Sequence, residues 1–237
     1  MRILMALWGM SCLLLADEEP TQKIQVVHTE RADFPAGGLL RFKNSIGELT
    51  VEGWDRPDVE IATIKSTKAL YSSRDREKGS HELDQVRISV ERRGNEVVVT
   101  TDFPRHRGLP PASLLRAATN FDLEYHIKAP VNARLAVDHD TGEVHVDGLT
   151  SDIHVTVLKG GTTLHLPQEG VYSVDARSDF GSVFSDFPGN AKRRPWLLGH
   201  RFLQGSPAAH SLYLRVGFGD ITILKIRKPS TPGPLTR

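Results

Sequence analysis

Short segments in which apolar and polar residues alternate dominate this chain, and such alternation is typical of half-buried β-strands. Within each segment the apolar side chains fall on one face, because successive side chains of a strand point to opposite sides. We expect that face to form the core. The side chains predicted to lie there are Val144, Val146, Ile153, Val155, Val157, Leu164, Leu166, Leu212, Leu214, Val216, Ile221 and Ile223.

Several of these segments share one local pattern, a Gly followed by a small or acidic residue and then an apolar one. Residues 47–51, 142–146, 181–185 and 219–223 show it, and residues 151–155 keep it with Ser in place of Gly. From Gly142 the corner residues recur at Ser151, Gly161, Gly170 and Gly181. Each step is long enough for one strand and one turn. The spacing predicts an all-β protein, a β-solenoid with rungs of about 19–20 residues, and a β-sandwich remains the alternative.

The rest of the chain predicts further strands with two interruptions. Strands are expected near residues 39–42, 49–51, 59–64 and 121–127, and a hairpin is expected at residues 86–100, since Gly94 and Asn95 suit a tight turn. Residues 71–83 predict a loop or one short surface helix. The Pro-containing segment 104–120 predicts a surface excursion, and the basic segment 191–205 an insertion in the penultimate rung.

The two ends of the chain predict segments outside the folded domain. Residues 1–16 have the layout of a secretory signal peptide, with Arg2 before an apolar run. Cys12, the only cysteine, lies inside this leader, and anchoring through its lipidation is the less favoured alternative. We expect residues 17–36 to form a linker, residues 37–227 the β-solenoid-like domain and residues 228–237 a disordered Pro-rich tail.

The charge balance limits the partners. The chain has 30 basic and 29 acidic residues, and removal of the leader takes away only Arg2. A neutral chain lacks the basic excess with which proteins bind phosphate backbones, so we expect no nucleic-acid partner.

Two stretches carry a resemblance to a known family. Residues 47–61 (GELTVEGWDRPDVEI) and 121–149 (FDLEYHIKAPVNARLAVDHDTGEVHVDGL) together resemble the bacterial putative-adhesin family of domains of unknown function. The resemblance implies a β-solenoid-like, envelope-associated protein without catalytic residues. The segments 104–120 and 191–205 depart from the family pattern.

Histidines and acidic residues are the two kinds of candidate metal ligand. His145, His154 and His165 alternate with core positions, so they are predicted to face outward, and His145 and His165 would stack on adjacent rungs. The acids Asp138, Asp140 and Glu143 lack the spacing of a calcium loop. The acids at successive turns are Glu143, Asp152 and Asp220. We expect water to solvate their carboxylates, and the alternative is that together they bind a cation. Neither set completes a ligand shell, so we predict no metal and no cofactor.

The sequence contains no recognisable set of catalytic residues. There is no G-x-S-x-G motif and no cysteine outside the leader. A carbohydrate-active β-solenoid enzyme is the alternative, with the acid pairs Asp138 and Asp140 or Asp175 and Asp179 facing a groove. We predict a noncatalytic, exported, periplasmic or cell-surface protein that contacts an envelope protein or polysaccharide.

One segment suggests a contact with a surface. Residues 192–201 (KRRPWLLGHR) place Trp196, Leu197 and Leu198 between basic residues, a composition suited to a partner or to an anionic membrane face. The alternative is that this segment covers one end of the core.

Overall fold

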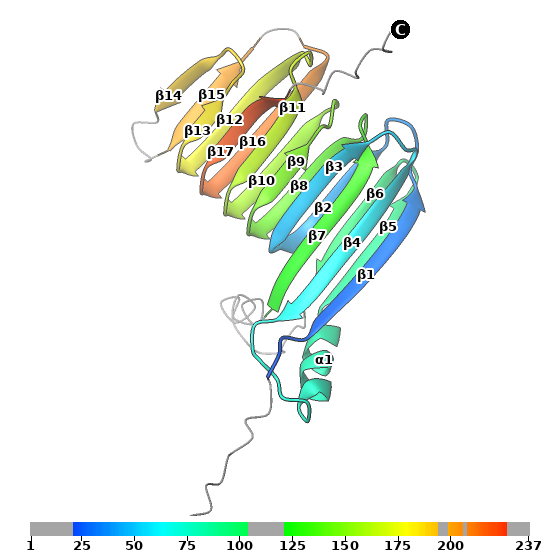
Figure 1. Cartoon of the computed structure of the whole chain (residues 1–237). Helices are drawn as coiled ribbons and strands as arrows, with labels where there is room; N and C mark the ends of the chain where they lie inside the picture. Colours follow the sequence, from blue (N-terminus) through cyan, green and yellow to red (C-terminus); the bar gives the residue numbers. More distant parts are fainter. Residues whose placement is uncertain (1–20, 104–120, 194–198, 206–207, 227–237) are drawn as a thin grey trace, which may run out of the picture.

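The chain forms two β-sheets that face each other as in a β-sandwich (Figure 1). The computed structural model describes residues 21–103, 121–193, 199–205 and 208–226. Both sheets are mixed, with parallel and antiparallel pairs. Within the described ranges one helix, α1 (Arg76–Asp84), lies at one end of the sheets. The predicted all-β class is confirmed.

The strands of the two sheets are as follows. The eight-stranded sheet contains, from edge to edge, β1 (Gln25–Asp33), β4 (Asp58–Thr67), β7 (Phe121–Pro130), β3 (Glu48–Trp54), β9 (Val144–Asp147), β11 (Thr162–Pro167), β17 (Ile221–Ile226) and β13 (Val183–Ser185). The nine-stranded sheet contains β14 (Asn190–Arg193), β15 (His200–Gln204), β12 (Tyr172–Phe180), β16 (His210–Phe218), β10 (Ile153–Lys159), β8 (Arg134–Thr141), β2 (Leu39–Ile46), β6 (Glu96–Asp102) and β5 (Arg87–Arg93).

The middle of the molecule is built by a chain that alternates between the sheets. β8 of the nine-stranded sheet leads into β9 of the eight-stranded sheet, β10 then pairs parallel with β8, and β11 pairs parallel with β9. Leu135 faces Ile153 and Val144 faces Thr162, a step of eighteen residues in both sheets. The turn-plus-strand repeat is therefore present here, with a step slightly shorter than the 19–20 residues predicted.

The order of these units differs from the predicted solenoid, in which each rung stacks on the preceding one. β16 and β17 lie between β10–β11 and β12–β13, although they come last in the chain (Figure 1). Residues 191–205 are not an insertion within a rung. They supply most of β14 and β15, which extend the nine-stranded sheet as antiparallel strands beyond β12. Strands pair through backbone hydrogen bonds, which do not depend on the identity of the side chains. The pattern of residues could therefore predict the strands but not which strands pair with each other.

Five glycines form a column where the chain turns from the nine-stranded to the eight-stranded sheet. They have positive φ angles and are, in spatial order, Gly47, Gly142, Gly160, Gly219 and Gly181. A Cβ on Gly142 would lie 1.8 Å from the carbonyl oxygen of Gly47, so the corners stack at backbone contact. The predicted corners at Gly47, Gly142, Gly181 and Gly219 are confirmed, but Gly160 rather than Gly161 has the positive φ angle, and Gly170 lies outside the column, between β11 and β12. Ser151 belongs to the opposite corner, between β9 and β10.

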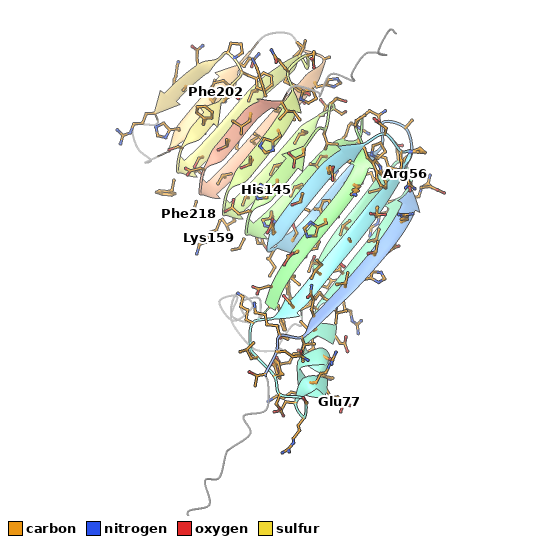
Figure 2. The ribbon with its side chains drawn as sticks, viewed as in Figure 1. Arg56, Glu77, His145, Lys159, Phe202 and Phe218 are labelled. Carbon is orange, nitrogen blue, oxygen red and sulfur yellow. The ribbon has the colours of Figure 1, made fainter. Side chains whose placement is uncertain are left out.

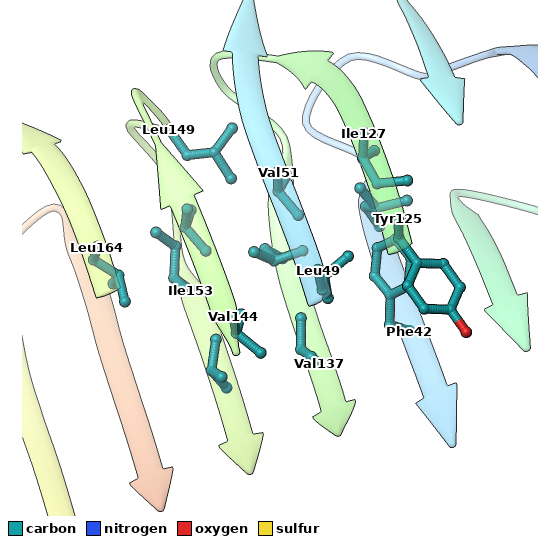
Figure 3. Close-up of a cluster of buried hydrophobic side chains, with 14 of the residues drawn as sticks. Phe42, Leu49, Val51, Tyr125, Ile127, Val137, Val144, Leu149, Ile153 and Leu164 are labelled. Atoms are coloured by element: carbon teal, nitrogen blue, oxygen red, sulfur yellow. The ribbon is translucent and has the colours of Figure 1, made fainter. Parts of the chain in front are cut away.

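The core lies between the sheets and is formed by the predicted faces (Figure 3). All twelve side chains predicted to face inward are at most 2% exposed. Large side chains from β2 and β7 join them, with Phe42 and Tyr125 in an edge-to-face contact of 6.3 Å between ring centroids. Two facing apolar sheet surfaces therefore hold the fold together.

The N-terminal half departs from prediction at one place. The linker predicted for residues 17–36 is wrong for β1, which pairs antiparallel with β4 over nine residues as an edge strand. The hairpin of β5 and β6 and the short helix are confirmed. The predicted leader with Cys12, the segment 104–120 and the tail 228–237 lie outside the described residues.

Candidate functional site

The outer face of the nine-stranded sheet carries a connected set of polar and aromatic side chains. β8, β10, β16 and β12 run parallel and in register, so their outward side chains form rows across the sheet. One row contains His154, Tyr213 and Asp175. The next contains Asp138, Thr156, Arg215 and Arg177.

Tyr213 is held between two planar groups. Its ring stacks on the imidazole of His154 at 4.4 Å between centroids, and the guanidinium carbon of Arg215 lies 3.8 Å from its centroid. Two groups at these distances cannot share one face of the ring, so they cover opposite faces. The phenol is therefore positioned by its neighbours and not by burial, since Tyr213 is 38% exposed.

Asp175 joins two arginines from different strands. Its Oδ2 accepts hydrogen bonds from Arg215 at 2.8 Å and from Arg201 of β15 at 3.0 Å. Arg215 also donates to the backbone carbonyl of Asp175 at 2.8 Å. Partial burial alone would raise the pKa of the Asp175 carboxyl, but the hydrogen bonds from Arg201 and Arg215 outweigh it and lower this pKa. We call His154, Tyr213, Arg215, Asp175 and Arg201 the Tyr213 network.

A shallow depression of about 450 Å³ adjoins this network. Gly217 has no side chain on the outer face, which leaves a gap between Leu158 of β10 and Asp179 of β12. The lining residues include Asp138, Asp140, Thr156, Leu158, Arg177, Asp179, Tyr213, Arg215 and Gly217. Acidic, basic, aromatic and aliphatic groups thus meet on one rigid sheet surface.

Asp140, which lines this depression, and His154 of the adjoining Tyr213 network have perturbed ionisation. Burial and the neighbouring Asp138 both raise the pKa of the Asp140 carboxyl. Burial lowers the pKa of His154, and Arg215 and Arg41 lower it further against the opposite effect of Asp138. Asp140 therefore holds a proton more readily than an ordinary carboxyl, and His154 less readily than an ordinary imidazole.

The predicted histidine stack does not form. The register of β9 and β11 places Thr163 beside His145 and Asp147 beside His165, and His165 Nδ1 hydrogen-bonds the carboxylate of Asp147. His154 lies on the other sheet. In the described part of the chain, no three His, Cys, Asp or Glu side chains gather closely enough to hold a metal ion.

The turn acids do not gather either. Asp152 accepts hydrogen bonds from the backbone N–H and hydroxyl of Ser211 at the β9–β10 corner, whereas Asp220 accepts from the N–H of Ser182 at the opposite corner. Glu143 belongs to the glycine-column corner, near Gly161. For Asp152 and Asp220 the structure thus shows turn chemistry in place of a cation site.

The acid pairs considered for glycan cleavage have unequal roles. The Asp175 carboxylate accepts hydrogen bonds from two arginines, and the Asp179 carboxylate accepts one from Arg177 Nε at 2.8 Å. Asp138 and Asp140 face the depression together. Only the latter pair retains carboxylates that could act on a ligand.

The segment 192–201 is described only at its ends. Trp196, Leu197 and Leu198 lie outside the described residues. On either side of them, β14 and β15 pair antiparallel, and Phe202 of β15 is buried. Phe202 therefore helps to cover this end of the core.

None of the helices in the described ranges is long and apolar enough to span a bilayer.

Sequence reasoning missed the residues that organise this face. Tyr213 and Arg215 alternate with the core residues Leu212, Leu214 and Val216, so their outward orientation was predictable. Their partners were not, because β16 contacts β10 and β12 only through the non-sequential strand order. His139, in phase with Leu135 and Val137, was also missed although its burial follows from the same alternation.

Comparisons with known proteins give structural similarities of low degree. No protein-family model and no curated protein matches the chain. The crystal structure of a putative cell adhesion protein from Clostridium sporogenes is similar over 87% of this chain and 100% of that one, with 14% identity and a TM-score of 0.46. The crystal structure of a putative adhesin from Bacteroides fragilis is similar over 85% of this chain and 97% of that one, with 11% identity and a TM-score of 0.30. A putative adhesin from Parabacteroides distasonis is similar over 86% of this chain and 67% of that one, with 12% identity and a TM-score of 0.23. At these scores the similarities carry no argument about function.

Proposed function

We propose that this protein is a noncatalytic, exported binding module of the bacterial cell envelope, which contacts an envelope protein or polysaccharide through the outer face of its nine-stranded sheet. The leader-like residues 1–16 and the family resemblance of residues 47–61 and 121–149 support export and an adhesin-like role. The parallel pairs of β8 to β11, with their eighteen-residue step, are the feature of the fold that supports this resemblance.

The observation that carries the proposal is the Tyr213 network beside the depression over Gly217. Side chains from β10, β16, β12 and β15 are held in place by mutual contacts on a rigid sheet. Such preorganisation lowers the entropy lost when a ligand binds. Tyr and Arg are also the residues that most often dominate binding surfaces.

The test is binding of the purified protein to isolated envelope polysaccharides and envelope proteins. Tyr213→Ala and Arg215→Ala should weaken binding at least about tenfold, as expected for central contact residues. His145→Ala on the other sheet is the matched control and should bind normally. If the first two variants bind like the unchanged protein, this face is not the contact surface.

Glycan cleavage is the second candidate, and Asp140 is the observation that favours it. A carboxyl with a raised pKa near a second carboxyl is the arrangement that glycosidases use for a general acid. Incubation with envelope polysaccharides followed by detection of new reducing ends tests it. Turnover that Asp138→Asn or Asp140→Asn abolishes would establish this candidate against the noncatalytic proposal.

A further inference from the structure

A pair of exposed aromatic rings lies at one corner of the molecule, away from the Tyr213 network. Phe180 and Phe218 are the last residues of β12 and β16, and their rings stack in parallel at 4.7 Å between centroids. They are 41% and 53% exposed. Contact with each other leaves much of both rings in water, where apolar surface is unfavourable.

The two other exposed apolar side chains near these strand ends lie on different faces. Leu158 of β10 is beside Gly217 and lines the depression on the outer face of the nine-stranded sheet. Phe184 of β13 pairs with Thr222 on the outer face of the eight-stranded sheet. We therefore call Phe180 and Phe218 alone the aromatic corner.

Basic side chains lie on two sides of the aromatic corner. Lys159 lies beside Phe218 at the same edge of the molecule (Figure 2). The hairpin of β14 and β15 is tied to this corner, because Gly199 pairs with Gly181 and His200 Nδ1 hydrogen-bonds the Gly181 carbonyl at 3.0 Å. Its residues Lys192 and Arg193 are exposed.

The cations are not neutralised by the acids nearby. Among the described residues Lys159, Lys192 and Arg193 make no ion pair, whereas Asp179 is paired with Arg177 at 2.7 Å. The carboxylate of Asp220 is turned toward the N–H of Ser182 at 2.6 Å. The aromatic corner is therefore apolar at its centre, with the cations Lys159, Lys192 and Arg193 near it and the carboxylate of Asp220 at the same corner.

We propose that the aromatic corner docks on the surface of a bilayer that contains anionic lipid. Aromatic and aliphatic side chains partition into the boundary between headgroups and acyl chains, and neighbouring Lys and Arg side chains are attracted to anionic headgroups. Phe218 and Lys159 project from an edge of the molecule (Figure 2). A projecting edge can enter a fluid lipid surface, whereas a protein partner would need a matching recess. This docking is independent of the proposed binding face, which lies on the strands themselves.

Vesicle co-sedimentation tests this proposal. The full chain and the chain from Asp17, which keeps every described residue, are compared on phosphatidylcholine vesicles with and without phosphatidylglycerol. We expect at least about tenfold tighter binding to the anionic vesicles at low salt, with the difference reduced by high salt because exposed charges are screened. Equal binding to both vesicle types by the chain from Asp17 would overturn the proposal.

Two double variants separate the apolar and charged contributions. Phe180→Ser with Phe218→Ser should weaken binding to anionic vesicles about tenfold, and Lys159→Glu with Lys192→Glu should weaken it at least about fivefold. Val27→Ser with Val171→Ser removes two apolar side chains elsewhere that are more exposed than Phe180 and Phe218, and should have no effect. Thermal unfolding verifies that each variant is folded.

Two results would contradict the proposed docking. The first is unchanged vesicle binding by both folded double variants. The second is a protein that self-associates through Phe180 and Phe218, detected by sedimentation velocity as a dimer that the double Ser variant dissociates without any change in vesicle binding. In that case the corner is a contact between copies of the chain.

Discussion

The carbonyl oxygen of Gly47 occupies the space that a side chain on Gly142 would need, only 1.8 Å from the position of its Cβ. Gly47 and Gly142 belong to different strand pairs, joined by the hydrogen bond from the Gly47 N–H to the Thr141 carbonyl at 2.7 Å. The close approach of the two corners is thus a property of the stacked sheets. It makes these glycines a structural requirement of the fold.

The first prediction concerns this corner. Gly142→Ala should destabilise the protein by about 3 kcal/mol or more, because the methyl group meets backbone and the φ angle is +130°. Gly94→Ala is the matched control. Gly94 also has a positive φ, but nothing lies within 4 Å of its Cβ position, so only about 1 kcal/mol is expected. Urea denaturation measures both, and equal losses would show that contact at the corner is unimportant.

The second prediction tests the assignment of faces on β9. Val144 is completely buried and His145 is on the outer face. Val144→Asp should destabilise the domain by about 4 kcal/mol or more, because it places a charge in the core. His145→Asp should change stability by less than about 1 kcal/mol. Thermal unfolding of the two variants tests this assignment of faces. Similar unfolding midpoints for Val144→Asp and His145→Asp would contradict it.

The third prediction follows from the buried His139. Its Nε2 lies 3.0 Å from the Gly47 carbonyl, which can only accept, so Nε2 carries the proton and Nδ1 accepts from the Ser45 hydroxyl at 2.8 Å. Burial lowers the pKa of His139 to about 4, against the opposite effect of hydrogen bonds with the Gly47 and Thr141 backbone. The folded protein therefore keeps this imidazole neutral.

Stability should consequently fall as the pH drops. Between the unfolded pKa of 6.5 and the folded value of about 4, the unfolded chain binds the proton and the folded chain does not. This difference removes up to about 3 kcal/mol, and most of the contribution is intact above pH 6.5. His139→Asn should flatten the dependence, leaving the smaller contribution of His154, whose pKa is also lowered. Urea denaturation at pH values from 7.5 to 4 measures the free energy of unfolding. If this free energy depends on pH as steeply in His139→Asn as in the unchanged protein, this account is refuted.

The fourth prediction concerns the buried hydroxyl of Tyr125. It lies 2.8 Å from Thr101 Oγ1 between the sheets, and burial raises the pKa of Tyr125 to about 12 even though hydrogen bonds with Thr101 and Ile46 lower it. Tyr125→Phe leaves the Thr101 hydroxyl buried without this partner and should cost about 1–3 kcal/mol. Adding Thr101→Val should restore part of the loss in chemical denaturation. A double variant no more stable than Tyr125→Phe would argue against the hydrogen bond as the cause.

The candidate site was accessible to sequence reasoning only in part. The alternation of β16 and β12 assigns Tyr213, Arg215 and Asp175 to an outer face. It does not indicate that Arg215 reaches Asp175, forty residues away in the chain, or that Arg201 joins them. Those contacts exist because β16 lies beside β12 and β15 closes on β12 from the other side.

The sequence by itself determined the all-β class, the strand faces and the corner glycines, since alternation and positive φ angles are local properties of residues such as Val144 and Gly142. The tertiary structure alone decided that β16–β17 would enter between earlier strands, that β1 would pair at an edge and that His165 would meet Asp147. The physical reason is that strand pairing uses backbone groups common to all residues. The choice of neighbour therefore depends on how the whole set of apolar faces is buried together.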